Sequence, residues 1–225
     1  MTTQPRRLAW LAVAGLGLIG VAIALALTSG HERHRTLTAV IGALVALSFI
    51  AGGIVAWWRR PGNRTGPLMA GVGFAFILSG LQEANESWLY TVGTVLGAMY
   101  LAVFVHLLLA YPDGRLHGRP ERILVPAAYA LAFLAELVPS LLRTKLDPSC
   151  KHDCPENAFL VHASPTAVDV FDALFTVVTI ALFAAVAVLL LRRWRAASVA
   201  ARRTLAPVFL SGGLAVVFIT ATFAV

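Results

Sequence analysis

Positive charge alternates along this chain, and that alternation constrains its fold more than any other feature. Seven long apolar runs are separated by loops, and Lys and Arg gather at the N-terminus and in every second loop. The runs cover residues 8–28, 37–58, 67–81, 88–111, 123–142, 168–191 and 205–225. All but the third reach the ~20 residues that an α-helix needs to cross ~30 Å of hydrocarbon. The sequence therefore predicts a multi-pass membrane protein with about seven spans.

The distribution of basic residues also predicts the orientation. Thirteen of the 18 basic residues lie at the N-terminus and in loops 59–66, 112–122 and 192–203, whereas the remaining loops hold five basic residues and most of the acidic ones. Because basic loops stay in the cytoplasm, we predict a cytoplasmic N-terminus. The net charge of +7 occurs as short Arg clusters beside apolar runs. We therefore expect contact with the lipid bilayer and no nucleic-acid partner.

Composition and periodicity define the fold class. The chain is 59% hydrophobic and 13% charged, with a mean hydropathy of +0.80, far from the usual composition of soluble domains. The alternating pattern of a membrane β-barrel strand is absent, and only helices satisfy backbone groups within such long apolar runs. The predicted fold class is all-α, a polytopic helix bundle that forms one membrane-embedded domain over residues 1–225.

The loop over residues 143–167 contains both cysteines of the chain, Cys150 and Cys154, on the predicted outer side. A cysteine pair facing an oxidising exterior most simply forms a disulfide. A metal site that adds His152 and His162 and a redox-sensitive switch are two alternatives. The Cys-x3-Cys spacing matches no standard zinc finger, so the disulfide and not the metal site is our prediction. Free thiols are the third alternative.

Three ionisable residues inside predicted spans are candidates for sensing a signal, because a charge in hydrocarbon costs at least ~2.5–3.5 kcal/mol and is usually retained for a reason. Glu136 lies in the fifth span, three residues before Pro139, and is either a ligand-facing group or an interhelical contact. Asp172 lies near the start of the sixth span, where it could also stabilise the helix N-terminus. His106 is either a bundle-facing polar contact or a proton relay.

Catalytic motifs are missing from the sequence. There is no Gly-x-Ser-x-Gly, no phosphate-binding Walker loop and no dinucleotide fingerprint. The stretch from His31 to His34 is one residue too short for a zinc protease motif. We therefore predict no catalytic residue and no cofactor-binding residue in the chain.

Three loop motifs nevertheless resemble one known group. The Leu-Leu-Leu-Ala-Tyr-Pro-Asp-Gly-Arg-Leu stretch at 107–116 resembles a turn in the membrane region of bacterial two-component sensor histidine kinases. The segments 58–69 and 153–161 look like two further elements of that group, in the same order.

The resemblance implies a membrane-embedded input module in the bacterial plasma membrane. In such proteins an eighth span, a dimerisation helix pair with the phosphoacceptor His and an ATP-binding domain follow, so the chain is expected to be truncated before them. ATP, a homodimeric state and a cognate response regulator are expected only through that further region.

Two other classes compete with the input module. A standalone transporter or permease component would show internal repeats and broken helices around a midplane site, and no convincing repeat is visible. An intramembrane enzyme would need a cluster of catalytic side chains at matching depth, which the sequence does not display.

Overall fold

The computed structural model describes residues 3–147, 150 and 152–196, and these residues form helices and loops without any strand. The all-α prediction is confirmed for this part of the chain. The helices are α1 (Thr3–Thr28), α2 (Arg35–Arg59), α3 (Thr65–Ser79), the 3₁₀ helix η1 (Gly80–Glu83), α4 (Ser87–Leu96), α5 (Met99–Ala110), α6 (Arg119–Leu142) and α7 (Pro165–Ala196).

Six segments in the described residues are long and apolar enough to cross a membrane, so the chain is a multi-pass membrane protein. They correspond to the first six predicted spans. The seventh predicted span, 205–225, lies outside the described residues. Many large apolar side chains on α1, α2 and α7 are exposed on the protein surface, as expected for helices that face lipid.

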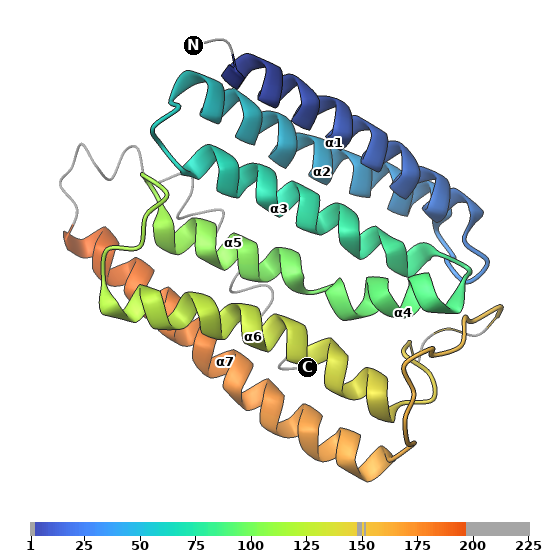
Figure 1. The fold of residues 1–225 in the computed structure, drawn as a ribbon. Helices are drawn as coiled ribbons and strands as arrows, with labels where there is room; N and C mark the ends of the chain where they lie inside the picture. Colours follow the sequence, from blue (N-terminus) through green and yellow to red (C-terminus); the bar gives the residue numbers. More distant parts are fainter. Residues whose placement is uncertain (1–2, 148–149, 151, 197–225) are drawn as a thin grey trace.

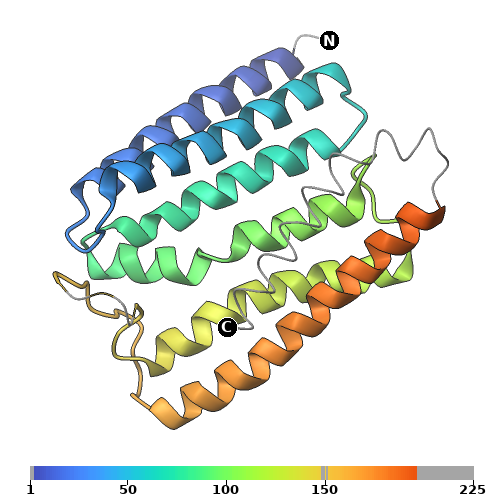
Figure 2. The same ribbon diagram turned by 180° about the vertical axis from the view of Figure 1, so that it is seen from behind.

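The helices lie side by side in the order in which they occur in the sequence (Figures 1 and 2). α1 packs on α2, α2 on α3, α3 on α5, α5 on α6, and α6 on α7. Successive spans run in opposite directions, whereas α4 and α5 run in the same direction and together form one span (Figure 1). Loops that follow one another along the chain therefore lie alternately at the two ends of the bundle.

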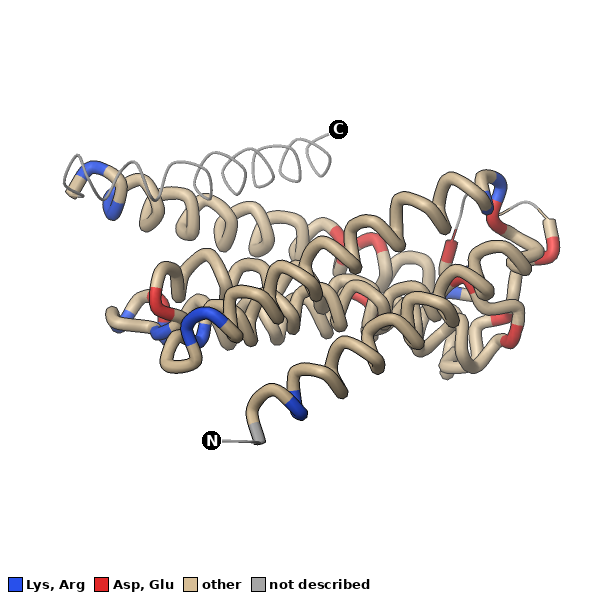
Figure 3. The backbone as a smooth tube through the Cα atoms, turned by 90° about the horizontal axis from the view of Figure 1, so that it is seen from above, with Lys and Arg blue, Asp and Glu red and all other residues tan. Residues whose placement is uncertain are grey.

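Charge separates between these two ends (Figure 3). The basic end comprises the start of α1, residues 60–64, residues 111–118 and the end of α7. The acidic end comprises residues 29–34, 84–86, 143–147 and 152–164. This arrangement follows directly from the alternation of basic loops in the sequence, and the positive-inside rule predicts that the basic end faces the cytoplasm.

Two apolar cores divide the bundle. The first lies among α1, α2 and α3 and centres on Ile19, Ala46, Ile50 and Ile77. The second lies among α5, α6 and α7. Its most completely buried side chains, Leu109 and Val186, are 0% exposed. The contact between α3 and α5 joins the two halves.

Glycine lets α2 and α3 approach closely. A Cβ atom added at Gly53 would lie 2.4 Å from the backbone nitrogen of Ala70, and one added at Gly66 would lie 2.5 Å from the backbone nitrogen of Trp57. Both positions are buried. Small residues at a membrane helix interface allow this kind of backbone contact, so α2 and α3 form the most closely packed pair in the first half.

The span predicted over 88–111 is present as Ser87–Ala110, but it consists of two helices. α4 ends at Leu96 and α5 begins at Met99. The amide of Gly97 bonds the Thr94 carbonyl three residues earlier, which tightens the last turn of α4. A uniformly apolar run gives no sign of such a break, because both halves have the composition of a span.

Other boundaries also differ from the prediction. The third span is longer than expected, because η1 extends α3 to give 19 residues from Thr65 to Glu83. α7 contains 32 residues and extends past the predicted 168–191 at both ends. The sequence-based limits were set by charged residues, but a helix can continue beyond the hydrocarbon wherever its backbone bonds continue.

We expect Gly53→Val to lower the free energy of unfolding by ~1–3 kcal/mol, because the added side chain would meet backbone atoms of α3. The measurement is unfolding in mixed detergent and SDS, followed by tryptophan fluorescence. Gly20→Val is the matched control, since nothing lies within 4 Å of a Cβ added at Gly20. Equal stability of the two variants would contradict the close packing of α2 on α3.

Candidate functional site

A cavity of about 370 Å³ lies between α5, α6 and α7. Its walls are mostly apolar, with Leu101, Val105, Leu131, Phe171, Phe175 and Phe183 among the lining residues. The polar side chains that line it are Glu136 and Arg143 from α6 and its C-terminal end, and Asp172, Thr176 and Thr179 from α7. An apolar cavity of this size with a few convergent polar groups is typical of a small-molecule site.

An ion pair forms part of the cavity wall. The Arg143 guanidinium donates a hydrogen bond to the Asp172 carboxylate, and both side chains are only partly exposed. Glu136 also lines the cavity and interacts electrostatically with both groups, favourably with Arg143 and unfavourably with Asp172. Two carboxylates thus face one guanidinium, and Glu136 has no ion pair of its own within the described part of the chain.

Irregular backbone adjoins the same cavity. Pro139 lacks the N–H that would bond the carbonyl of Ala135, and Ala135 lines the cavity. The break between α4 and α5 places Ala98 in the wall as well. In a membrane protein, unbonded backbone groups at this depth are found where they face protein or a cavity. Pro139 and the break between α4 and α5 thus both interrupt regular helix hydrogen bonding beside an otherwise apolar space.

The structure brings two of the three predicted sensing candidates together. Glu136 and Asp172 line one cavity. Asp172 lies deeper in its helix than expected, because α7 begins at Pro165, about two turns before Asp172. His106 lies elsewhere: its Nδ1 atom is 3.3 Å from the hydroxyl of Tyr129. Sequence reasoning missed the role of Arg143, which was counted only as a basic loop residue.

The cysteine-bearing loop folds back onto the acidic end. The Asn157 side chain donates to the carbonyls of Ser140 and Arg143, at 2.5 and 2.6 Å, and so satisfies backbone groups at the end of α6. The Ala158 amide donates to the Thr91 hydroxyl of α4, and Phe159 packs near Trp88. The loop therefore connects α4 with the end of α6 beside the cavity.

The two cysteines are joined to each other. Cys150 and Cys154 form a disulfide with their Cα atoms 5.9 Å apart. The amide of His162 lies 3.3 Å from the carbonyl of Leu141, so this residue is held against α6. No group of three or more His, Cys, Asp or Glu side chains in the described residues is arranged to hold a metal ion.

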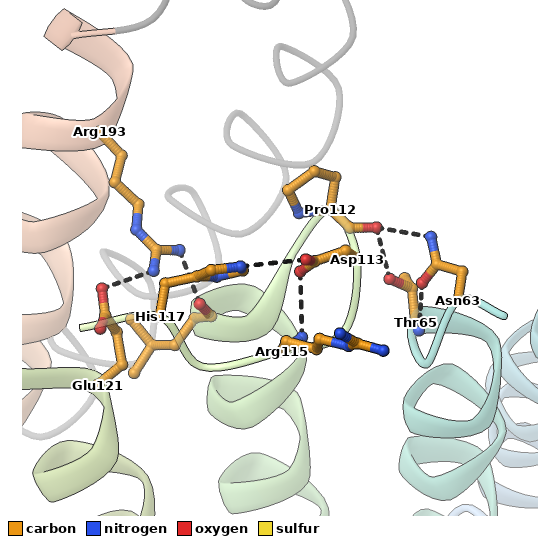
Figure 4. A network of polar contacts seen from close by, with 9 residues as sticks. Asn63, Thr65, Pro112, Asp113, Arg115, His117, Glu121 and Arg193 are labelled. Atoms are coloured by element: carbon orange, nitrogen blue, oxygen red, sulfur yellow. Dashed lines mark hydrogen bonds and ion pairs between the residues drawn. The ribbon is translucent and has the colours of Figure 1, made fainter. Parts of the chain in front are cut away.

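At the basic end, the segments 58–69 and 107–116 are joined by hydrogen bonds (Figure 4). The carbonyl of Pro112 accepts hydrogen bonds from the Asn63 side chain at 2.9 Å and from the Thr65 hydroxyl at 2.8 Å. Gly114 has a φ of +74°, and a Cβ added there would lie 2.4 Å from the backbone of Arg64. Only glycine fits this contact, which fixes the 111–116 turn against the start of α3.

A second junction at the basic end ties α7 to α5 and α6. Arg193 donates to the Leu109 carbonyl at 2.7 Å and to the Glu121 carboxylate at 2.6 Å (Figure 4). Glu121 is 7% exposed and lies in the first turn of α6, where a carboxylate also interacts well with the helix dipole. Nothing in the sequence pairs these two residues, which are 72 positions apart.

Compared with known proteins, the chain matches no family model, no curated protein and no solved structure. The cavity, the two junctions at the basic end and the loop motifs are therefore the features that bear on its function.

We expect Arg193→Met to lower the free energy of unfolding by ~3–5 kcal/mol, because it would leave the buried Glu121 carboxylate without its partner. The exposed pair of His117 and Asp113, at 3.1 Å, provides the control. His117→Ala is expected to change stability by ~1 kcal/mol or less. Unfolding in detergent and SDS measures both, and a similar small effect for Arg193→Met would show that the junction does not hold α7 in place.

Proposed function

We propose that this chain is the sensory and anchoring input module of a bacterial two-component sensor histidine kinase, located in the plasma membrane. One observation carries the proposal. α7 contributes Asp172 to the cavity near the acidic end and Arg193 to the junction at the basic end. These residues are separated by ~30 Å of continuous helix, so one rigid element connects a possible binding site with the predicted cytoplasmic side.

The proposed mechanism is a shift between two arrangements of α7. A compound that enters the cavity and competes for Arg143 or Asp172 changes the contact between α6 and α7. Because Arg193 is fixed to Glu121 and to the Leu109 carbonyl, movement of α7 alters the packing at the basic end. A ligand produces such a shift only to the extent that it binds one arrangement more tightly than the other.

The loop motifs add support of a different kind. The segments 58–69 and 107–116 both resemble elements of sensor kinase membrane regions, and they pack against each other through Pro112 and Gly114. Because the two motifs form one contact, their joint presence supports the resemblance more than either motif would alone. The kinase core itself, with ATP, a homodimer and a response regulator, belongs to the proposal as further parts of the full-length protein.

A transporter or permease component is the second candidate. The break between α4 and α5 adjoins the cavity through Ala98, and broken helices beside a central site are typical of transporters. Solute uptake into vesicles that carry the purified protein, abolished by Glu136→Gln, would favour this function over the sensor.

The gene sequence after codon 225 gives the first test of the sensor proposal. We expect one more span followed by a coiled helix with a phosphoacceptor His. In the full-length protein, Asp172→Asn is then expected to change the autophosphorylation rate about fivefold or more, because it removes the partner of Arg143. Asp169→Asn is the matched control, since Asp169 is exposed and does not line the cavity.

Two results would contradict the sensor function. A stop codon directly after codon 225 would remove the route to a kinase core. Equal autophosphorylation rates for the Asp172 and Asp169 variants would show that the cavity does not control kinase activity.

A further inference from the structure

A second cavity, of about 390 Å³, lies between α1, α2 and α3 and reaches the acidic end. It is separate from the cavity of the candidate site and shares no residue with it. Apolar side chains from all three helices line it, among them Ile19, Ile23, Ile41, Phe76 and Ile77. Its size falls within the ~300–1,000 Å³ range of small-molecule sites.

One buried carboxylate in this wall lacks a full set of partners. Glu83, the last residue of η1, is 9% exposed, and its Oε2 atom has no hydrogen-bond partner among the described residues. Ser29, which is 0% exposed, is a hydrogen-bonding neighbour of the same side chain. A buried carboxylate oxygen without a partner is costly, so a positively charged group placed beside it would be strongly favoured.

The groups around Glu83 meet this need only in part. Glu32 also lines the cavity and acts unfavourably on Glu83, and no Lys or Arg is among the lining residues. The imidazole of His31 acts favourably on Glu83, but its ring nitrogens lie 3.3 Å from the Ser29 hydroxyl and 3.0 Å from the Gln82 carbonyl, and Glu83 Oε2 stays without a hydrogen-bond partner among the described residues. Two carboxylates and no Lys or Arg thus line this cavity, in a chain whose net charge is +7.

The chemistry of the walls separates organic from inorganic cations. A hard metal ion needs several oxygen ligands around it, and the described residues contain no cluster of acidic, His or Cys side chains arranged in that way. An organic cation needs one carboxylate and an apolar surface for its carbon atoms. The cavity offers this combination, with Glu83 at its end and the isoleucine and phenylalanine side chains along its length.

We propose that the cavity between α1, α2 and α3 binds an amphipathic organic cation, with the cationic group against Glu83 and the apolar part between α1 and α2. The site does not depend on the sensor function, because it rests only on residues of α1, α2, α3, η1 and the loop between α1 and α2. A cation of this kind can enter from the acidic end, where Glu32 and His34 line the cavity.

Equilibrium dialysis of hexyltrimethylammonium tests the proposal. The protein is held in phosphatidylcholine nanodiscs, and empty nanodiscs measure partitioning into lipid. We expect a single saturable site, and Glu83→Gln is expected to weaken binding about tenfold. Glu86→Gln is the matched control, because Glu86 is exposed, lies three residues away and does not line the cavity. Its affinity is expected to equal that of the unaltered protein.

A second variant tests the location without changing charge. Gly42 lines the cavity, and a Cβ added there would meet only Phe76, at 4.0 Å. Gly42→Leu is therefore expected to fold and to fill the space, with loss of hexyltrimethylammonium binding. If Glu83→Gln does not fold, Gly42→Leu still tests whether hexyltrimethylammonium binds in this cavity.

Three results would overturn the proposal. The first is an absence of saturable hexyltrimethylammonium binding, and the second is an unchanged affinity in either cavity variant. Equal binding of hexyl sulfate or hexanol would identify the cavity as a general apolar groove for lipid chains.

Discussion

The cost of placing charge and unbonded backbone in hydrocarbon determines most of this structure. It forces the apolar runs of the described residues into helices and directs most of the arginines to one end of the bundle. The same cost makes the exceptions informative. Glu136 and Asp172 face a cavity shared with Arg143, Glu121 is paired with Arg193, and Glu83 lines a second cavity with one oxygen unpartnered. Polar groups are thus retained where helices meet around a space or at the ends of the bundle.

The two halves of the bundle have different mechanical characters. α2 and α3 are in direct backbone contact through Gly53 and Gly66, which leaves little room for relative movement. α5, α6 and α7 surround a cavity without such backbone contact, and ion pairs connect α7 with the two ends of α6. Both halves contain a cavity, but the direct contact of α2 with α3 makes this pair suited to be the fixed frame against which α7 moves in the proposed input module.

The sequence predicted the fold class and the first six spans because hydropathy and the alternation of Arg are direct consequences of the bilayer. It also identified Glu136 and Asp172, since charge within an apolar run is conspicuous. It did not predict the break after Leu96, because both flanking segments are equally apolar. Arg143 and Arg193 looked like ordinary loop residues, and their partners lie 29 and 72 positions away. Glu83 was counted with the other acidic residues of its side, and only the three-dimensional contacts reveal its burial.

Labelling of the cysteines in intact cells tests the account most directly, because it depends on both the topology and the disulfide. A membrane-impermeant maleimide is expected to leave Cys150 and Cys154 unmodified at first and to label both after treatment with an impermeant phosphine reductant. In a Cys150→Ser and Cys154→Ser background, a single Asn63→Cys at the basic end is expected to react only after the cells are permeabilised. Labelling of Asn63→Cys in intact cells, together with no labelling of Cys150 and Cys154 in the unaltered protein even after reduction, would reverse the orientation and contradict the account.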